Sequence, residues 1–554
     1  DHLATTMRDV PARQRSLRAV FTSSWDLLAA EEQTVLSRLS PFAGGFTVDA
    51  ARAVAGATPV LLERLLDKSF LRQVENGRYQ MHEVLRHFAA EALGAERAAV
   101  SRRFSGYYAD FAAAQHKLLN SDRQQEGLAT MTGEFDNLMA AWRGALEQAG
   151  EPGGEAGLHP FADALWAYLD DRSLYRDGLA LFEQALAAAP AEPGMEERAR
   201  VWAYLRLAVG FFHQRLGEYP EARYHYEQCL EVYRRLGDQK LCGHCLYYLG
   251  SIASNGGRQE EAASHLREAL AIYQRLESER HVANILTKLG GVLELMGRYE
   301  EAEQMLHEAL ALKREVGQPL AIAHSLNNLG LVLWHMGRFD EAEGRFREAL
   351  AVNREVGNAA NVVLCLNNLG RMFVTLGKYR PAEALLQESL TLQQHVQNKR
   401  QMAFALNTLG LVSHLQGEGE RAHAYLVQAL ALARETGNRV QATSARLTLA
   451  RILLDEGEVE EAAGLLRRGL QEAAELRLTP MALSALVQAA RLLLIRGERA
   501  RADALLQLSM RHPAAWWETR VEAREMAEKR GLTADLGAAA NDLQQTIAEL
   551  INTL

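Results

Sequence analysis

The chain has 554 residues, which a prior of about 150 residues per domain would divide into three or four globular units. Apolar residues make up 48% and charged residues 24%, and these proportions exclude an intrinsically disordered chain and a collagen-like one. The net charge of −9 gives no overall basic field toward nucleic acid, while four cysteines and short apolar runs predict a cytoplasmic protein without a disulfide framework or a membrane span.

Residues 14–92 predict several short helices followed by a β-hairpin. The helices are expected over 17–28, 31–39, 48–54 and 60–68, and the strands over 70–74 and 78–82. Asn76-Gly77 lies at the turn of the hairpin, where both residue types tolerate the positive φ that a type I′ turn requires. This order of elements predicts a small winged-helix domain.

Two motifs of this domain are similar to those of STAND-class (NB-ARC type) signalling ATPases. They are Ser-Leu-Arg-Ala-Val-Phe at 16–21 and Met81-His82-Glu83 after the hairpin, where Glu83 replaces the aspartate of the family. The resemblance implies that His82 contacts the β-phosphate of bound ADP and holds a closed, inactive state. An imidazole N–H at the start of a helix can donate to a phosphate oxygen, although a histidine in this place is more often only a structural hydrogen-bonding residue.

The resemblance also implies a nucleotide-binding domain upstream of Asp1, with residues 1–13 as the end of its connecting segment and with ADP or ATP bound by the intact protein. No Gly-x-x-x-x-Gly-Lys-Ser/Thr run occurs in the sequence, so we expect no catalytic residues and no cofactor in this chain. The helix expected over 60–68 balances Glu63 and Asp67 against Arg64 and Lys68, so we do not expect direct nucleic-acid binding either.

Residues 93–195 are helical in pattern and predict an arm between the winged helix and the region that follows. Within it, Glu134-Phe135-Asp136-Asn137-Leu138 resembles the acidic-Asp-Asn-Leu signature that precedes the repeats of STAND regulators. The stretch 175–186 aligns with 219–230 at an offset of 44 residues, which predicts a degenerate capping repeat at the end of the arm.

Residues 196–512 repeat with a period of 40. Four series of positions share this period: glycines from Gly217 to Gly497, alanines from Ala222 to Ala502, leucines from Leu230 to Leu470 (with Met510), and glycines from Gly210 to Gly410 (then Ala450 and Ala490). In each unit an apolar helical pattern ends at a glycine and a second helix opens with acidic residues. The small residues Gly330 and Ala342, one on each helix of a unit, predict a close approach of the two backbones.

These units resemble tetratricopeptide repeats, with 40 residues in place of the usual 34. The resemblance implies an all-α fold: a right-handed superhelix of about eight helical hairpins, preceded by the small winged-helix domain and the helical arm. We expect residues 513–554, which begin Pro-Ala-Ala-Trp-Trp, to form capping helices over the last repeat.

Such repeats usually hold a partner on a concave face that the first helices line. The polar residues at the corresponding positions could hold a peptide or protein ligand, because side-chain amides pair with an extended backbone. They are Tyr247, Tyr248, Lys288, Asn327, Asn328, Asn367, Asn368, Arg371, Asn407, Thr408 and Arg451. The alternative is that the asparagines only bridge adjacent helices.

Cys242-Gly243-His244-Cys245 has the spacing of a redox or zinc motif, yet it begins a repeat helix and no second cysteine pair follows it. We therefore predict no metal site.

These features predict the ligand-sensing and autoinhibitory region of a STAND-type ATPase, in which the winged helix couples ligand binding to an upstream nucleotide switch. An oligomer is one form that the activated protein could take. The alternative is a free-standing repeat scaffold for protein assembly.

Overall fold

The computed structural model of the chain falls into two compact units, Asp1–Asp238 and Gln239–Leu554. It describes residues 22, 24–74, 77–119, 121, 123–149, 157–188, 196–256, 258–317, 319–396, 399–530 and 543–554. The predicted segment 1–13 and most of the predicted helix over 17–28 lie outside the described residues. No helix in the described ranges is long and apolar enough to cross a lipid bilayer.

The first unit begins with the winged helix that the sequence predicts. Its elements are α2 (Ala30–Arg38), α3 (Val48–Ala55), α4 (Pro59–Asp67), β1 (Leu71–Val74), β2 (Arg78–Met81) and α5 (Glu83–Ala92). The strands are antiparallel, with Leu71 opposite Met81 and Val74 opposite Arg78. One feature was not predicted: Phe46 forms a β-bridge with Tyr79, which adds a third short strand segment beside β2.

Local capping explains where two of these helices begin. The Thr47 hydroxyl accepts a hydrogen bond from the Ala50 amide at 3.2 Å, and the Thr58 hydroxyl accepts one from the Leu61 amide at 3.3 Å. Each bond satisfies an amide that has no partner within the first turn of a helix.

Helices alone make up the arm and the repeats. The arm contains α6 (Arg97–Leu119), α7 (Gln124–Gly133), α8 (Phe135–Gln148), α9 (Leu158–Asp171) and α10 (Tyr175–Ala187). The first helical hairpin, α11 (Glu196–Leu216) with α12 (Tyr219–Arg235), closes the first unit.

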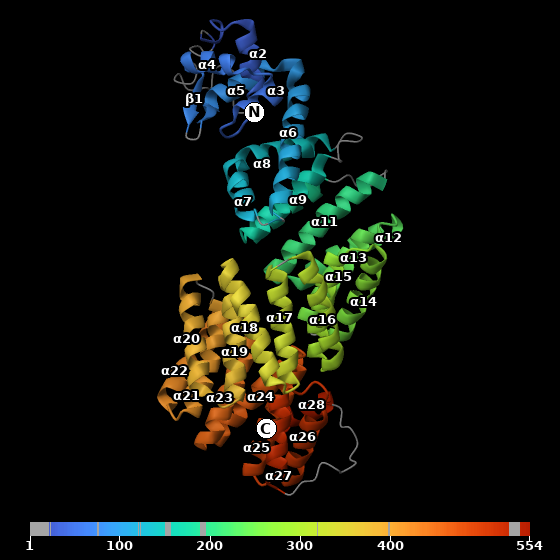
Figure 1. The fold of residues 1–554 in the computed structure, drawn as a ribbon, viewed down its shortest axis with the longest axis vertical. Coiled ribbons are helices and arrows are strands. Elements are labelled where there is room, and N and C mark those ends of the chain that lie inside the picture. The colour runs from blue at the N-terminus through green and yellow to red at the C-terminus, as the bar shows by residue number, and fades with distance from the viewer. Residues whose placement is uncertain are drawn as a thin grey trace. The chain divides into compact units, whose positions relative to one another are not determined.

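Seven further hairpins stack in the second unit, each helix antiparallel to the next (Figure 1). They are α13 (Gln239–Asn255) with α14 (Gln259–Arg275), α15 (Glu279–Leu295) with α16 (Tyr299–Val316), α17 (Pro319–His335) with α18 (Phe339–Val356), α19 (Ala359–Thr375) with α20 (Tyr379–Val396), α21 (Lys399–Leu415) with α22 (Gly419–Glu435), α23 (Arg439–Glu456) with α24 (Val459–Glu475), and α25 (Thr479–Ile495) with α26 (Arg499–Arg511). The predicted all-α fold of tetratricopeptide-like hairpins is thus confirmed, with one hairpin in the first unit and seven in the second.

The close approach within each hairpin has a specific partner. A Cβ placed on Gly290 of α15 would lie 2.7 Å from Leu306 Cγ, and one placed on Gly330 of α17 would lie 2.7 Å from Phe346 Cε1. The repeating alanines, Ala302 and Ala342 in these two hairpins, are fully buried, and the large side chain lies four residues after each of them. The small residue of the first helix therefore makes room for a leucine or an aromatic ring of the second helix, and also for the helical turn that carries the buried alanine.

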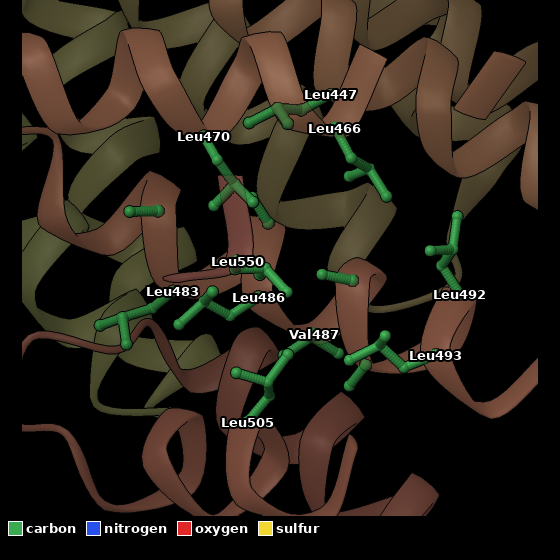
Figure 2. Packing of buried hydrophobic residues seen from close by; sticks show 14 of the residues in the cluster. Leu447, Leu466, Leu470, Leu483, Leu486, Val487, Leu492, Leu493, Leu505 and Leu550 are labelled. Atoms are coloured by element: carbon green, nitrogen blue, oxygen red, sulfur yellow. The ribbon is translucent and has the colours of Figure 1, made fainter. Parts of the chain in front are cut away.

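Two helices follow the last hairpin, α27 (Trp517–Glu528) and α28 (Leu543–Thr553). α27 packs against α26 and α25, and α28 packs against α24. Figure 2 shows Leu550 of α28 among the buried leucines of α24 and α25, including Leu470 and Leu486. The end of the chain thus shares one hydrophobic core with the last two hairpins.

Two adjacent glycines of α15 provide a test of the close approach. We expect Gly290→Ala to lower the free energy of unfolding by about 1–3 kcal/mol, because the added methyl group overlaps Leu306. Gly291→Ala should raise it by up to about 1 kcal/mol, because no atom lies within 4 Å of that Cβ and alanine favours a helix. Urea unfolding of the two variants measures both changes, and equal shifts would contradict the packing described here.

Candidate functional site

His82 is the N-cap residue of α5 and is exposed to solvent. Its Nδ1 accepts a hydrogen bond from the Val84 amide at 3.3 Å. A neutral imidazole whose Nδ1 accepts carries its proton on Nε2, so the outer nitrogen is available as a donor. The structure thus shows the helix cap, and the contact of His82 with a phosphate stays a prediction, which a donor at the start of the helix would permit.

Glu134 and Asn137, from the acidic-Asp-Asn-Leu motif, join the arm to the winged helix. The Asn137 side chain accepts from the Gly44 amide at 3.0 Å and donates to the Gly45 carbonyl at 2.9 Å. Glu134 accepts from the Tyr108 hydroxyl at 2.8 Å and pairs with Arg78 of β2. Burial and the adjacent Glu134 carboxylate raise the pKa of Tyr108.

This network binds the backbone of Gly44 and Gly45 in the turn before α3, and it binds the Arg78 side chain on one strand of the hairpin. Both acidic and amide side chains are at most 9% exposed, so water does not compete for their hydrogen bonds. The motif that the sequence only matched to a family therefore has a physical role, which is to fix the winged helix on the arm.

A cavity of about 1430 Å³ in the second unit opens to solvent and is lined by the first helices of the hairpins, by single residues of some second helices and by the C-terminal helices. On two of the first helices the lining includes residues with the spacing i, i+4, i+7, which are Phe404, Thr408 and Leu411 of α21 and Ser444, Thr448 and Arg451 of α23. Residues at this spacing share one face of a helix. The set on α21 is mainly apolar, and the set on α23 is polar.

Several polar groups of the cavity have no internal partner. Arg451 has no carboxylate within 4 Å among the residues described, although it is half-buried. Asn407 Oδ1, Gln441 Oε1 and Gln488 Oε1 are buried atoms that no hydrogen-bond donor reaches in the described part of the chain. Unpaired buried amides are costly, so this surface is chemically suited to a ligand that carries backbone-like donors and an anionic group.

Three asparagines of the predicted ladder, Asn327, Asn367 and Asn368, are buried and do not line the cavity, whereas Asn407 does. Asn327 and Asn367 are 3% and 1% exposed. Asn327 accepts from Asn368 at 3.0 Å, Asn367 accepts from the Ser389 hydroxyl at 2.7 Å, and Asn407 donates to the Ser444 hydroxyl at 3.1 Å. These bonds connect neighbouring helices, which is the bridging role that the sequence offered as the alternative.

The other predicted ligand residues lie at different depths. Tyr247, Tyr248, Lys288 and Asn328 are half-buried and do not line the cavity, whereas Thr408, Asn407, Arg371 and Arg451 line it. Arg371 is not free for a ligand in this conformation, because its guanidinium group lies between the rings of Trp334 and Trp516.

Sequence reasoning missed the cavity residues outside the 40-residue series. Gln441 repeats Gln401 of the preceding unit but belongs to none of the four series, Gln488 stands where the preceding unit carries Thr448, and Trp516 to Glu518 lie beyond the last repeat. Only the paired tryptophans were a visible signal in the sequence. Cys242 and Cys245 are buried core residues, and no group of three metal-ligating side chains occurs in the ranges that the structure covers.

A buried lysine lies on the second helix of the third hairpin, at the position where the next two units carry Asn353 and Gln393. Lys313 Nζ, on α16, donates to the Thr287 and Ser325 hydroxyls at 2.6 and 2.9 Å, and the two hydroxyls are 2.9 Å apart. The residue is 3% exposed, and no carboxylate of the described residues lies within 4 Å of it. Burial lowers the pKa of Lys313 to about 8.

The repeats match a known family. The pattern of the tetratricopeptide repeat is found at residues 199–275, 265–315, 281–353, 320–395 and 405–436. This finding explains the hairpins, the capping glycines and the fully buried alanines together.

Three relatives carry the name HTH-type transcriptional regulator, one from Mycobacterium bovis and two from Mycobacterium tuberculosis. Each is 33% identical to this chain over 195 residues, a match that spans 33% of this chain and 22% of the relative. The chain therefore corresponds to only about a fifth of the length of these proteins.

One solved structure is similar over 95% of this chain and 67% of its own, with a TM-score of 0.53 and 14% identity. It is a signal transduction ATPase with numerous domains (STAND) that has a tetratricopeptide repeat sensor, from Pyrococcus horikoshii. At this identity the likeness establishes the fold, which agrees with the resemblance noted in the sequence.

The lysine in the third hairpin should make stability depend on pH. In the unfolded chain the amine has its ordinary pKa of 10.5, so below pH 8 the amine is charged in both states and folding buries that charge. The burial lowers the free energy of unfolding by about 3 kcal/mol, and this cost disappears as the pH rises from 8 to 10.5. Lys313→Met should remove this cost, because Thr287 and Ser325 remain bonded to each other. We therefore expect the variant to be more stable than the wild type at pH 7 and to lose this advantage toward pH 10.5. Urea unfolding across this range measures the difference, and a difference independent of pH would show that the amine is not the cause.

Proposed function

We propose that the tetratricopeptide repeats of this chain are the sensor of a STAND-type regulatory protein, and that the cavity of the second unit binds a peptide or a peptide segment of a protein. In this proposal the winged helix couples ligand binding to a nucleotide-binding domain upstream of Asp1, which holds ADP in the resting state. An oligomer would form when the switch opens.

The observation that carries the proposal is the unpaired polar lining of the cavity. Arg451 supplies a cation, and the unpaired amide oxygens of Asn407, Gln441 and Gln488 supply acceptors for the N–H groups of a peptide backbone. Phe404 and Leu411 supply an apolar surface on the neighbouring helix. A peptide with an acidic group next to an apolar side chain matches this combination.

The coupling part of the proposal is supported by the first unit. Asn137 and Glu134 hold the winged helix on the arm through buried hydrogen bonds, so a displacement of the arm is transmitted to the hairpin and to α5. His82 stands at the start of α5 with Nε2 as a donor. A ligand moves such a switch only if it binds the open and the closed state with different affinity.

Peptide selection tests the cavity. Peptides selected on the chain from a random library should share an acidic residue, and Arg451→Ala should weaken their binding by about 10- to 100-fold, because an uncompensated carboxylate loses a charge-assisted bond of about 1.5–3 kcal/mol. Arg467→Ala, an exposed arginine on α24, is the matched control and should leave binding unchanged. Isothermal titration calorimetry measures both. Equal affinities of the two variants would place the ligand outside the cavity.

Two substitutions separate the roles of His82. In the full-length protein, His82→Asn should keep the helix cap, since asparagine is a strong N-cap residue, and should lose at least tenfold in ADP retention. His87→Ala, on the exposed face of α5, should retain ADP like the wild type. The measured quantities are the melting temperature and the amount of ADP that co-purifies. If His82→Asn retained ADP fully, the residue would be only a cap.

A further inference from the structure

The segment Pro513–Arg520 leaves the last hairpin and lies against the third and fourth hairpins of the repeat series. The Tyr299 hydroxyl at the start of α16 donates to the Ala515 carbonyl at 3.4 Å, a bond between residues 216 positions apart. α27 also contacts α17, which belongs to the fourth hairpin. The C-terminal segment thus does more than cover the end of the solenoid.

Aromatic rings and one arginine form the centre of this contact. The Arg371 guanidinium lies 5.0 Å from the Trp334 ring and 4.9 Å from the Trp516 ring, and Trp516 stacks on His335 with 6.0 Å between the ring centroids. The Glu518 carboxylate is 3.7 Å from the same guanidinium group. Arg371 thus contacts an aromatic residue and the acid two positions after it, and a cation favours both a π face and a carboxylate.

Two turn glycines accommodate the segment at close range. A Cβ on Gly337 would lie 2.6 Å from Trp517 Nε1, and a Cβ on Gly297 would overlap the Pro513 carbonyl. Trp517 also packs edge-on against Phe339 at 4.8 Å. Glycines at the equivalent turns of the next two hairpins, Gly377 and Gly417, have no atom within 4 Å of such a Cβ.

Some buried polar atoms of this contact have no hydrogen-bond partner among the described residues. Glu518 Oε2, Thr519 Oγ1 and Arg520 Nε are buried without a hydrogen-bond partner in the described part of the protein, and each would regain water if the segment moved away. Ala514 and Ala515 of the segment are themselves buried in the hydrophobic core of the last two hairpins, to which Leu506 of α26 and Leu550 of α28 also belong. Release of the segment would therefore expose two alanine side chains at the edge of that core and leave its leucines packed.

We propose that Pro513–Arg520 is a releasable latch, and that the surface made by Tyr299, Trp334, His335, Phe339 and Arg371 is a docking site for segments in which an aromatic residue precedes an acid. The latch itself is the resident ligand. Ala514 and Trp516 to Thr519 also line the cavity, so release of the latch opens one wall of it.

This last step, the control of access to the cavity, rests on the proposed function. The latch and its docking surface do not, and the two experiments below require no ligand in the cavity. Failure of the latch and failure of the peptide-sensing proposal can therefore be told apart.

The glycines give a matched pair of variants for hydrogen exchange. Gly297→Ala/Gly337→Ala and Gly377→Ala/Gly417→Ala place the same methyl groups at turns with φ between 68° and 83°, so their backbone strain is equal. Only the first pair meets the latch. We expect hydrogen exchange of residues 513–520 to be at least tenfold faster in the first pair and unchanged in the second. Equal exchange in both pairs would overturn the proposal.

A second experiment leaves these turns as they are. A fluorescein-labelled peptide with the sequence of residues 512–522 should bind the full chain carrying Trp516→Ala/Trp517→Ala at least tenfold more tightly than it binds the wild type, whose own latch competes. The same peptide with both tryptophans replaced by alanine is the control and should not bind. Fluorescence anisotropy measures the affinities. Equal affinity for variant and wild type, or no binding to the variant, would show that the surface is not an exchangeable docking site.

Discussion

The close approach of two helices at one small residue sets the geometry of this protein. In the hairpins from α11 to α22, a glycine of the first helix faces a leucine or an aromatic ring of the second, at a distance that leaves no room for a methyl group. Because this contact recurs every 40 residues, each hairpin has nearly the same shape, and identical hairpins that stack with a constant small rotation generate a curved array. The concave cavity is the inner side of that curve. The size and position of the cavity therefore depend on the lack of space for a Cβ atom at the glycine of each of these hairpins.

The same regularity explains why polar residues of the inner helices have two different tasks. Side chains one position apart on a helix point in directions about 100° apart, so Asn407 and Thr408 cannot serve the same neighbour. Asn327 and Asn367 face the adjacent helices and bridge them, whereas Arg451 and Thr448 face the cavity. At Asn407 the bridging bond leaves one amide atom unpaired in the cavity wall.

The sequence predicted the hairpins well because the residues that define them are fixed by sterics and recur in phase. It also predicted the winged helix, since Asn76-Gly77 and the capping residues act locally. It could not predict that Asn137 binds the backbone of Gly44 and Gly45, because backbone groups leave no trace in the side-chain pattern. Nor could it predict the contact of Trp516 with His335, which depends on the pitch of the whole array and not on any local spacing.

An open solenoid behaves as a one-dimensional chain of units, in which each hairpin is stabilised by its two neighbours and the ends fray first. The bond between Tyr299 and Ala515 gives the third hairpin a further neighbour more than 200 residues away. With that bond made, the hairpins between Tyr299 and Ala515 form a closed array without a free end. A local loss of structure in one hairpin then destabilises the others in the array. The thermal unfolding transition of the second unit should then be sharper than that of hairpins that unfold independently. The C-terminal segment therefore determines the cooperativity of unfolding as well as the closure of the array.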